Sequence, residues 1–216
     1  MEKEDNEEKW NSFFYPNSNV FINKLDIKDE KELLKKESEL SFERLVDLYE
    51  SPINGSFDAD HLSMIHNYLF QDLYSWAGEY RNVNISKNQS NFADYRNIKT
   101  SLDYELALMN KDINQVYNKD MLSYFLADYY VALLDIHPFR DGNGRTIREF
   151  LREFTLTKTR ELGFGEYELD FSKMDSQVIN AAMVNAKFFK SPIIMEFNKA
   201  LVNKELTETG DYNYVR

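Results

Sequence analysis

The residues from His137 to Arg148 combine, within twelve positions, the side chains that phosphate chemistry requires. The stretch reads HPFRDGNGRTIR and supplies an imidazole, a carboxylate, a Gly-Asn-Gly turn and two arginines. An imidazole titrates at about pH 6.5, so it can accept a proton from a hydroxyl group at neutral pH. A carboxylate can bind Mg²⁺, and glycines let backbone N–H groups approach an anion closely. The combination favours phosphoryl or nucleotidyl transfer.

The segments on either side of this stretch are predicted to be helices. Residues 124–136 form a strongly apolar run, and the apolar residues at positions 147, 150, 151 and 154 have the spacing of one helical face. The stretch is therefore predicted to be a loop between two helices, with Gly144 and Arg145 opening the second. Unpaired N–H groups at the start of a helix carry the positive end of its dipole and attract phosphate.

Composition favours one large helical domain. The chain has 216 residues, of which 43% are hydrophobic, and its seven Gly and four Pro favour helices over a turn-rich β fold. The absence of Cys excludes disulfides and thiolate metal sites. A net charge of −11 argues against binding to nucleic acid or to anionic membranes. Because the sequence also lacks a secretory signal pattern and a long apolar stretch, we expect a cytoplasmic protein.

Hydrophobic periodicity predicts a series of helices and one hairpin. The predicted helices span residues 29–50, 58–76, 95–110, 120–136, 145–162 and 173–189, with a last one that begins at Ser191-Pro192. The helix 120–136 is apolar nearly all round and is expected to be the central buried one. Residues 81–92 alternate weakly and predict a short β-hairpin, whereas the acidic residues 1–10 predict a frayed tail.

The stretch HPFRDGNGRTIR matches the Fic-domain signature HPFx[D/E]GNGRxxR at each of its nine defined positions. Further segments are similar to the same family, namely Gly55–Asp58, His61-Leu62, Ile65-His66, Leu69-Phe70, Trp76–Gly78, Ile85–Lys87 and Phe92-Ala93. The resemblance implies an all-α, Fic-type helical fold with one short β-hairpin, called the flap. It implies a Fic core over residues 53–197. Residues 1–52 are then expected to be a tail and a flanking helix packed on the core, and residues 198–216 the end of the last helix and a tail.

The resemblance also implies an activity, that of a protein adenylyltransferase. Such an enzyme transfers AMP from ATP to a Tyr, Thr or Ser hydroxyl of a target protein, or of itself, and releases pyrophosphate. His137 is the implied general base, and Asp141 is the implied ligand of Mg²⁺, which would bridge the α- and β-phosphates.

Other motif residues are expected to bind the nucleotide. The expected anion hole for the α-phosphate comprises the backbone N–H groups of Gly142, Asn143 and Gly144 with the Asn143 amide. Arg145 and Arg148 lie one helical turn apart and can face the same phosphates, and Arg148 is the expected partner of the γ-phosphate. By analogy, the adenine is expected toward the helix that contains residues 180–185.

The flap is expected to bind the target protein. Its residues Ile85, Ser86, Lys87 and Phe92 are expected to hold an extended segment of the target by main-chain pairing. Such pairing would position a side-chain hydroxyl without demanding much sequence specificity.

The sequence leaves alternatives for how the protein is regulated and for which group it transfers. Many Fic proteins are inhibited by the glutamate of an [ST]xxxE[GN] motif, which pairs with the second motif arginine. No Glu in this sequence is followed by Gly or Asn, so either a separate antitoxin-like inhibitor chain supplies the glutamate or control is different. Alternative functions are transfer of UMP, GMP, phosphocholine or the γ-phosphate, and a non-catalytic nucleotide-binding module.

Overall fold

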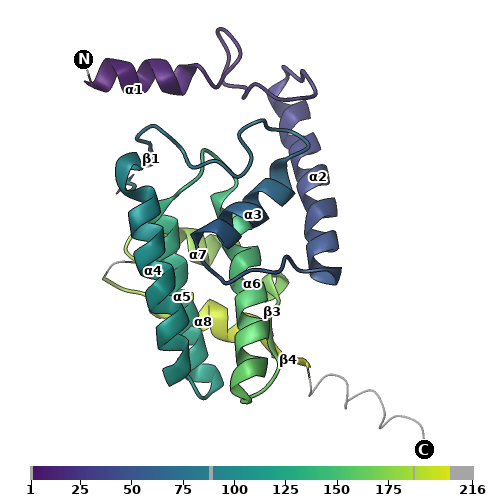
Figure 1. The fold of residues 1–216 in the computed structure, drawn as a ribbon, viewed down its shortest axis with the longest axis vertical. Coiled ribbons are helices and arrows are strands. Elements are labelled where there is room, and N and C mark those ends of the chain that lie inside the picture. Colours follow the sequence, from purple (N-terminus) through teal and green to yellow (C-terminus); the bar gives the residue numbers. More distant parts are fainter. Residues whose placement is uncertain (1, 88–89, 187, 205–216) are drawn as a thin grey trace, which may run out of the picture. The chain divides into compact units, whose positions relative to one another are not determined.

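The computed structural model describes residues 2–87, 90–186 and 188–204. These residues are mainly helical, which confirms the predicted fold class (Figure 1). They form two compact units that are interleaved in the sequence. The first unit comprises residues up to 101 together with 136–146, and the second comprises 102–135 and the residues from 147 onwards. The expected core boundaries at residues 53 and 197 stay a prediction.

Helices and a hairpin build the described part of the first unit. The helices are α1 (Glu2–Asn11), α2 (Glu30–Glu50) and α3 (Ala59–Phe70). The carboxylates of Asp29 and Asp58 accept hydrogen bonds from backbone N–H groups in the first turns of α2 and α3, so each stabilises the start of its helix. Helices α2 and α3 lie side by side (Figure 1). Arg44 of α2 donates to both oxygens of Asp72, which follows α3.

The predicted hairpin is present in the first unit. Strands β1 (Ser86–Lys87) and β2 (Ser90–Asn91) are antiparallel, with Ser86 paired to Asn91. The 3₁₀ turn η1 (Tyr95–Asn97) and the first residues of α4 (Ile98–Asp112) complete this segment.

The second unit contains most of the remaining helices and a β-ribbon. Its elements include α5 (Lys119–Ile136) as far as Asp135, α6 (Asn143–Leu162) from Ile147 onwards, α7 (Ser176–Met183), α8 (Ser191–Ala200) and the 3₁₀ turns η2 (Ile113–Gln115) and η3 (Phe171–Lys173). The first turn of α6, with Arg145, belongs to the first unit. Strands β3 (Tyr167–Leu169) and β4 (Leu201–Asn203) pair antiparallel, a ribbon that the sequence did not predict. Leu122, Leu126 and Leu133 of α5 are fully buried, in agreement with the burial expected for this helix.

Two predictions about the first unit were wrong. Residues 1–10 were expected to be a frayed tail, yet residues 2–11 form α1, whose Trp10 packs edge-on against Phe14 and Phe21. The helix expected over 58–76 ends at Phe70. Tyr74 and Trp76 stack with their ring centroids 4.3 Å apart. Residues two apart on a helix point away from each other, so this stacking requires a non-helical segment.

Apart from the end of α6, the limits of α6 and α7 also differ from the prediction. The helix expected from residue 173 begins at Ser176, because the side chain of Asp175 accepts hydrogen bonds from the N–H groups of Gln177 and Val178 at its start. It ends at Met183 instead of Phe189. Helix α6 begins two residues earlier than expected and stops, as predicted, before Gly163, whose positive φ of 72° is typical of a helix terminus.

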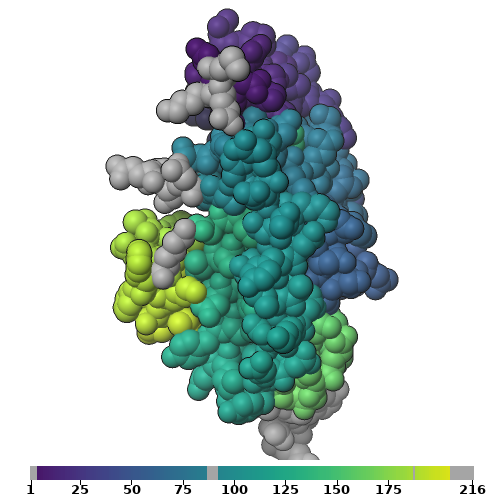
Figure 2. All heavy atoms as spheres, turned by 60° about the vertical axis from the view of Figure 1, so that its left-hand side comes forward, coloured from purple at the N-terminus to yellow at the C-terminus, as the bar shows by residue number. Residues whose placement is uncertain are grey.

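The helices of the described part differ from membrane-spanning ones. Within residues 2–87, 90–186 and 188–204, no helix has both the length and the apolar character needed to cross a bilayer. Apolar side chains are nevertheless exposed in the second unit. Among them are Val184, Phe188 and Met195, from the yellow-green segment in Figure 2.

Candidate active site

The loop that carries the motif has an unusual backbone at His137. This residue has a positive φ of 50°, a region that non-glycine residues rarely adopt. The turn directs three consecutive carbonyl groups toward Arg81. Its Nε donates to the His137 oxygen at 2.8 Å, its Nη2 to that of Ile136 at 3.1 Å, and its backbone N–H to that of Pro138 at 2.8 Å. These bonds compensate for the strained backbone.

His66 of α3 supports the middle of the loop. Its ring stacks on Phe139, which is fully buried, with the centroids 3.8 Å apart. Its Nδ1 accepts from the N–H of Gly78 at 2.8 Å, so Nε2 carries the proton and donates to the Asp141 carbonyl at 3.0 Å. Burial lowers the pKa of His66 to about 3, with further lowering by the charges of Arg145 and Arg140, so this imidazole is neutral at physiological pH.

Gly142 is required where the loop meets α6. Its φ is 74°, and a Cβ built on it would lie 2.3 Å from the Phe70 ring. Its carbonyl accepts from both the N–H and the hydroxyl of Thr146, each at 3.1 Å. Its N–H donates to Oδ1 of Asp141 at 2.5 Å. The side chain of Asp141 is otherwise exposed.

Asn143 fastens the loop through its side chain. The Oδ1 atom accepts from the N–H of Phe139 and the Nδ2 atom donates to the Phe139 carbonyl, both at 2.9 Å. The residue is almost fully buried. The side-chain amide of Asn143, which was predicted to bind phosphate, therefore also closes the loop. Its contribution to an anion hole stays a prediction, as do those of the Gly142 and Gly144 N–H groups.

Arg145 lies in the first turn of α6 and binds two residues of α2. Its Nη2 donates to Oε1 of Glu37, and its Nη1 donates to the hydroxyl of Ser41 at 3.0 Å. The hydroxyl of Tyr74 donates to the other oxygen of Glu37. Burial and the charge of Glu37 both raise the pKa of Tyr74, so it remains a hydrogen-bond donor over the physiological range. The guanidinium of Arg145 also lies 4.6 Å from the Phe70 ring centroid.

The second motif arginine, Arg148, lies three residues further along α6 and is partly exposed. It belongs to the second unit, as do residues 180–185, which were expected near the adenine. Their roles stay predictions.

The flap reaches His137 through one aromatic contact. The ring of Phe92 stacks on the His137 imidazole, with the centroids 3.9 Å apart and the planes 14° from parallel. Of the other predicted flap residues, Ile85 is partly buried, Ser86 is exposed, and the backbone of Lys87 lies in β1. Residues 88 and 89, at the predicted tip, lie outside the described residues.

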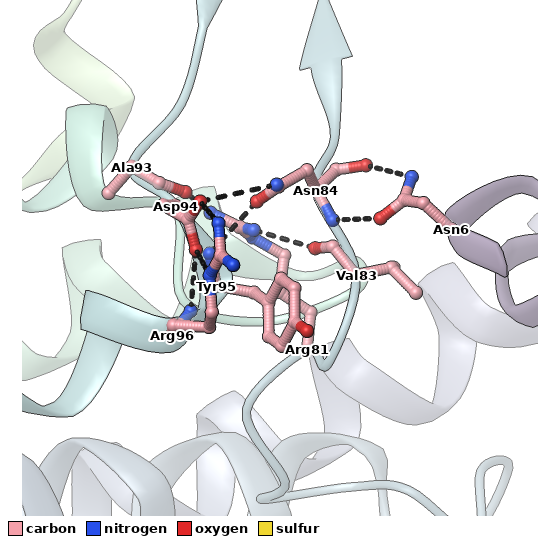
Figure 3. Close-up of polar contacts among 8 residues, drawn as sticks. All are labelled: Asn6, Arg81, Val83, Asn84, Ala93, Asp94, Tyr95 and Arg96. Carbon is pink, nitrogen blue, oxygen red and sulfur yellow. Dashed lines mark hydrogen bonds and ion pairs between the residues drawn. The ribbon is translucent and has the colours of Figure 1, made fainter. Parts of the chain in front are cut away.

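A polar network holds the base of the flap, as Figure 3 shows. Asn6 of α1 accepts from the N–H of Asn84 at 2.6 Å and donates to the Asn84 carbonyl at 3.0 Å. The side chain of Asn84 accepts from the N–H of Tyr95 at 2.9 Å. Hydrogen bonds from Arg96 lower the pKa of the neighbouring Asp94, so this carboxylate is ionised at neutral pH.

Comparison with known proteins identifies the family. The Fic/DOC family model matches residues 56–155, which include the flap and the motif. A protein of Sinorhizobium fredii named probable protein adenylyltransferase y4lH is 32% identical over 179 residues, which cover 80% of this chain and 85% of that protein. The chain belongs to the Fic/DOC family.

Other Fic proteins resemble this chain over most of its length. Protein adenylyltransferase VbhT of Bartonella schoenbuchensis is 35% identical over 201 residues, which cover 89% of this chain but 38% of VbhT. The chain thus spans about two fifths of the length of that relative. Among solved structures, the N-terminal Fic domain of a VirB-translocated Bep effector protein from Bartonella quintana has a TM-score of 0.80 at 24% identity. It covers 91% of this chain and 98% of that one. BepC from Bartonella tribocorum has a TM-score of 0.77, also at 24% identity, and covers 90% and 98%.

Arg81 and Glu37 are among the residues that bind the motif loop without a role predicted from the sequence. Arg81 follows the WAG segment within the family match, whereas Glu37 precedes that match. Neither has a local signal, because their partners lie 56 and 108 residues away in the sequence.

Proposed function

We propose that this chain is a protein adenylyltransferase that transfers AMP from ATP to a Tyr, Thr or Ser hydroxyl of a target protein. The observation that carries the proposal is the complete motif on one fixed loop, with His137 facing the flap residue Phe92. The names of the relatives VbhT and y4lH support AMP as the transferred group. Modification of the chain itself belongs to the same proposal.

In the proposed reaction, His137 acts as the general base. The target hydroxyl gives its proton to the imidazole while its oxygen forms a bond to the α-phosphorus of ATP. The bond between the α-phosphorus and the oxygen that bridges to the β-phosphate breaks, and pyrophosphate leaves with the electron pair. A base in this position contributes about 10²–10⁴-fold to the rate.

Asp141 fits the requirements of a magnesium ligand. In the described residues, no group of three or more His, Cys, Asp or Glu side chains could hold a metal ion without other ligands. Mg²⁺ commonly takes one or two carboxylates and completes its shell with substrate phosphates and water. One exposed carboxylate beside a helix N-terminus meets this requirement. When bound, the ion would neutralise phosphate charge as pyrophosphate leaves.

The N-terminus of α6 is the proposed site of the phosphates. The first N–H groups of a helix have no acceptor within it, and Gly142, Asn143 and Gly144 are at this end. Arg145 and Arg148 add positive charge one turn apart. Support comes from the relatives named above, because BepC is described with bound AMPPNP and the Bartonella quintana domain with bound ADP.

The flap is the proposed docking edge for the target. The main chain of Ile85, Ser86 and Lys87 would pair with an extended segment of the target, next to Phe92 and His137.

We also propose a separate inhibitor chain, because the sequence lacks an intact [ST]xxxE[GN] motif. We propose a cytoplasmic location as well, and the absence of Cys supports it.

Isotope position in ATP tests the proposed reaction. The purified chain is incubated with Mg²⁺, a cell lysate and ATP labelled either at the α- or at the γ-phosphate. We expect protein labelling from α-labelled ATP alone, and mass spectrometry should find AMP on a hydroxyl side chain. Labelling from γ-labelled ATP would indicate a kinase. No labelling from either, although ATP binds, would indicate a nucleotide-binding module.

A further inference from the structure

Arg81 is buried at the base of the flap, and the hydrogen bonds of its side chain go to main-chain oxygens. It is 1% exposed. Its Nη1 donates to the Val83 carbonyl at 2.7 Å and its Nη2 to the Ala93 carbonyl at 2.5 Å, as Figure 3 shows. The remaining bonds of the guanidinium go to the carbonyls of Ile136 and His137. Burial lowers the pKa of Arg81 to about 10, which still leaves it charged at neutral pH.

These four carbonyls belong to two functional segments. Val83 precedes the first flap strand and Ala93 follows the second, so one guanidinium binds both arms of the hairpin. Ile136 and His137 lead into the motif loop. Arg81 therefore connects the hairpin expected to present the target hydroxyl with the residue expected to deprotonate it.

Arg81 is also connected to the ring of His137, through Ala93 and Phe92 of the flap. Phe92, whose ring stacks on this imidazole, immediately precedes Ala93. Because His137 has a positive φ, the direction of its carbonyl is unusual, and the bond from Nε of Arg81 fixes it. The guanidinium thus constrains His137 through its backbone and, by way of Ala93 and Phe92, on the face of its ring.

We propose that Arg81 is a positioning residue, which sets the distance between the flap and His137; the proposal rests on the proposed function. No other side chain offers five N–H donors in one plane. Lysine retains the charge but presents donors from a single atom, so it cannot reach carbonyls on both segments in the same way. Misplacement of a reacting group by about 1 Å can reduce a rate about 10²-fold.

The Asn6–Asn84 pair provides a weaker attachment of the same hairpin. Asn6 binds both backbone polar groups of Asn84 as a neighbouring strand would, and these bonds are solvent-exposed. Removing them should loosen one arm of the hairpin while Arg81 keeps its four bonds. Asn6→Ala is thus a milder test of the same connection.

The test compares Arg81→Met, Arg81→Lys and Asn6→Ala with Arg44→Met in the full chain. Arg44 is the matched control, because it is also an arginine of the first unit but its hydrogen bonds go to Asp72, outside the flap and the motif loop. Hydrogen exchange is measured at residues 83–87 and 92–94, and NMR of ¹³C-labelled histidine reports on the three His residues. AMP transfer from α-labelled ATP is measured on unstructured peptides that each contain one Tyr, Thr or Ser, and ATP affinity is measured by calorimetry.

For Arg81→Met we expect faster exchange in both arms and an altered His137 signal. We expect about 10²-fold slower AMP transfer with ATP affinity changed by no more than about twofold. Arg81→Lys should recover part of the rate, Asn6→Ala should loosen residues 83–87 only slightly, and Arg44→Met should change none of these. Wild-type exchange and His137 signals in Arg81→Met, or an equal loss of transfer in Arg44→Met, would overturn the proposal.

Two provisions keep this test decisive. If Arg81→Met does not fold, Arg81→Lys and Asn6→Ala still predict graded loosening of the hairpin, and unchanged exchange in both would reject the proposal. If the wild-type chain transfers no AMP, the proposed function fails, whereas the exchange and NMR measurements still decide whether Arg81 connects the flap to His137.

Discussion

Arg81 in the first unit and Arg152 in the second are both almost fully buried, yet their guanidinium groups bind different partners. Arg81 donates to four main-chain carbonyls and has a lowered pKa. Arg152 donates to both oxygens of Glu149 and to Glu168, and although burial lowers its pKa, these hydrogen bonds produce a net rise.

The difference in partners predicts different consequences when each arginine is removed. Carboxylates neutralise Arg152, so removing it should leave the buried carboxylate of Glu149 without its guanidinium partner. Glu168 keeps its ion pair with Lys204. Carbonyl dipoles solvate Arg81, and its removal should release backbone segments rather than expose a charge. In the first unit, Arg81 holds the flap and the motif loop together. In the second unit, Arg152 joins α6 to β3.

The largest expected effect on stability is that of Arg152→Met. It leaves the buried carboxylate of Glu149 without its cation, whereas Glu168 keeps its ion pair with Lys204. The free energy of unfolding in urea denaturation should fall by about 3–5 kcal/mol, because one buried charge loses its partner. Arg160→Met is the control, because the Arg160–Glu166 pair is exposed, and we expect a change below about 1 kcal/mol. Equal effects of the two substitutions would remove the contrast between the two arginines.

Gly142→Ala should have the next largest effect, about 3 kcal/mol. The substitution combines a positive φ with a Cβ that collides with the Phe70 ring. Gly163→Ala separates the two causes, because Gly163 has a similar φ of 72° but a Cβ there would have no atom within 4 Å. Urea denaturation should give about 1 kcal/mol for this control, and an equal cost at both sites would exclude the steric contribution.

The loop should also confer a pH dependence through His66. Its folded-state pKa of about 3 lies below the unfolded value of about 6.5, so between these values only the unfolded chain takes up the proton. Stability is therefore complete above about pH 6.5 and decreases as the pH falls toward 3. We expect a loss of about 2 kcal/mol from this group between about pH 7 and pH 5. His66→Gln should abolish that share of the loss, and an unchanged pH profile would contradict the assignment.

The smallest expected effect is that of Glu37→Gln on nucleotide binding. Glutamine can still accept the hydrogen bond of Arg145 but no longer neutralises its charge. Phosphate should then be attracted more strongly, and calorimetry should show ATP binding roughly fivefold tighter. Glu39→Gln is the control on the same helix, because Glu39 pairs with exposed lysines. Weaker ATP binding in Glu37→Gln would mean that the carboxylate orients Arg145 rather than competing with phosphate.

The sequence predicted the motif loop because its information is local. Periodicity located the flanking helices, and the sequence Gly142-Asn143-Gly144 predicted a turn between them, where Gly142 has a positive φ. The partners of the loop could not be predicted in the same way. Arg81, His66 and Glu37 reach it only after the chain has folded, and no periodicity connects residues so far apart.

Errors in the prediction have similar causes. Helix α1 was not predicted because it has little apolar character. It is held in the folded unit by Trp10, which packs against Phe14 and Phe21. The β3–β4 ribbon joins strands more than thirty residues apart in the sequence, each only three residues long. Such pairing depends on tertiary context more than on the strand residues themselves.

AMP transfer by wild-type protein and by His137→Ala is the sharpest test of His137 as the general base. Both proteins are incubated with α-labelled ATP, Mg²⁺ and the same acceptor peptides, and ATP affinity is measured in parallel. We expect labelling by the wild type, about 10²–10⁴-fold slower labelling by His137→Ala, and similar ATP affinity for both. Labelling at the wild-type rate in His137→Ala would contradict the assignment of this residue as the base.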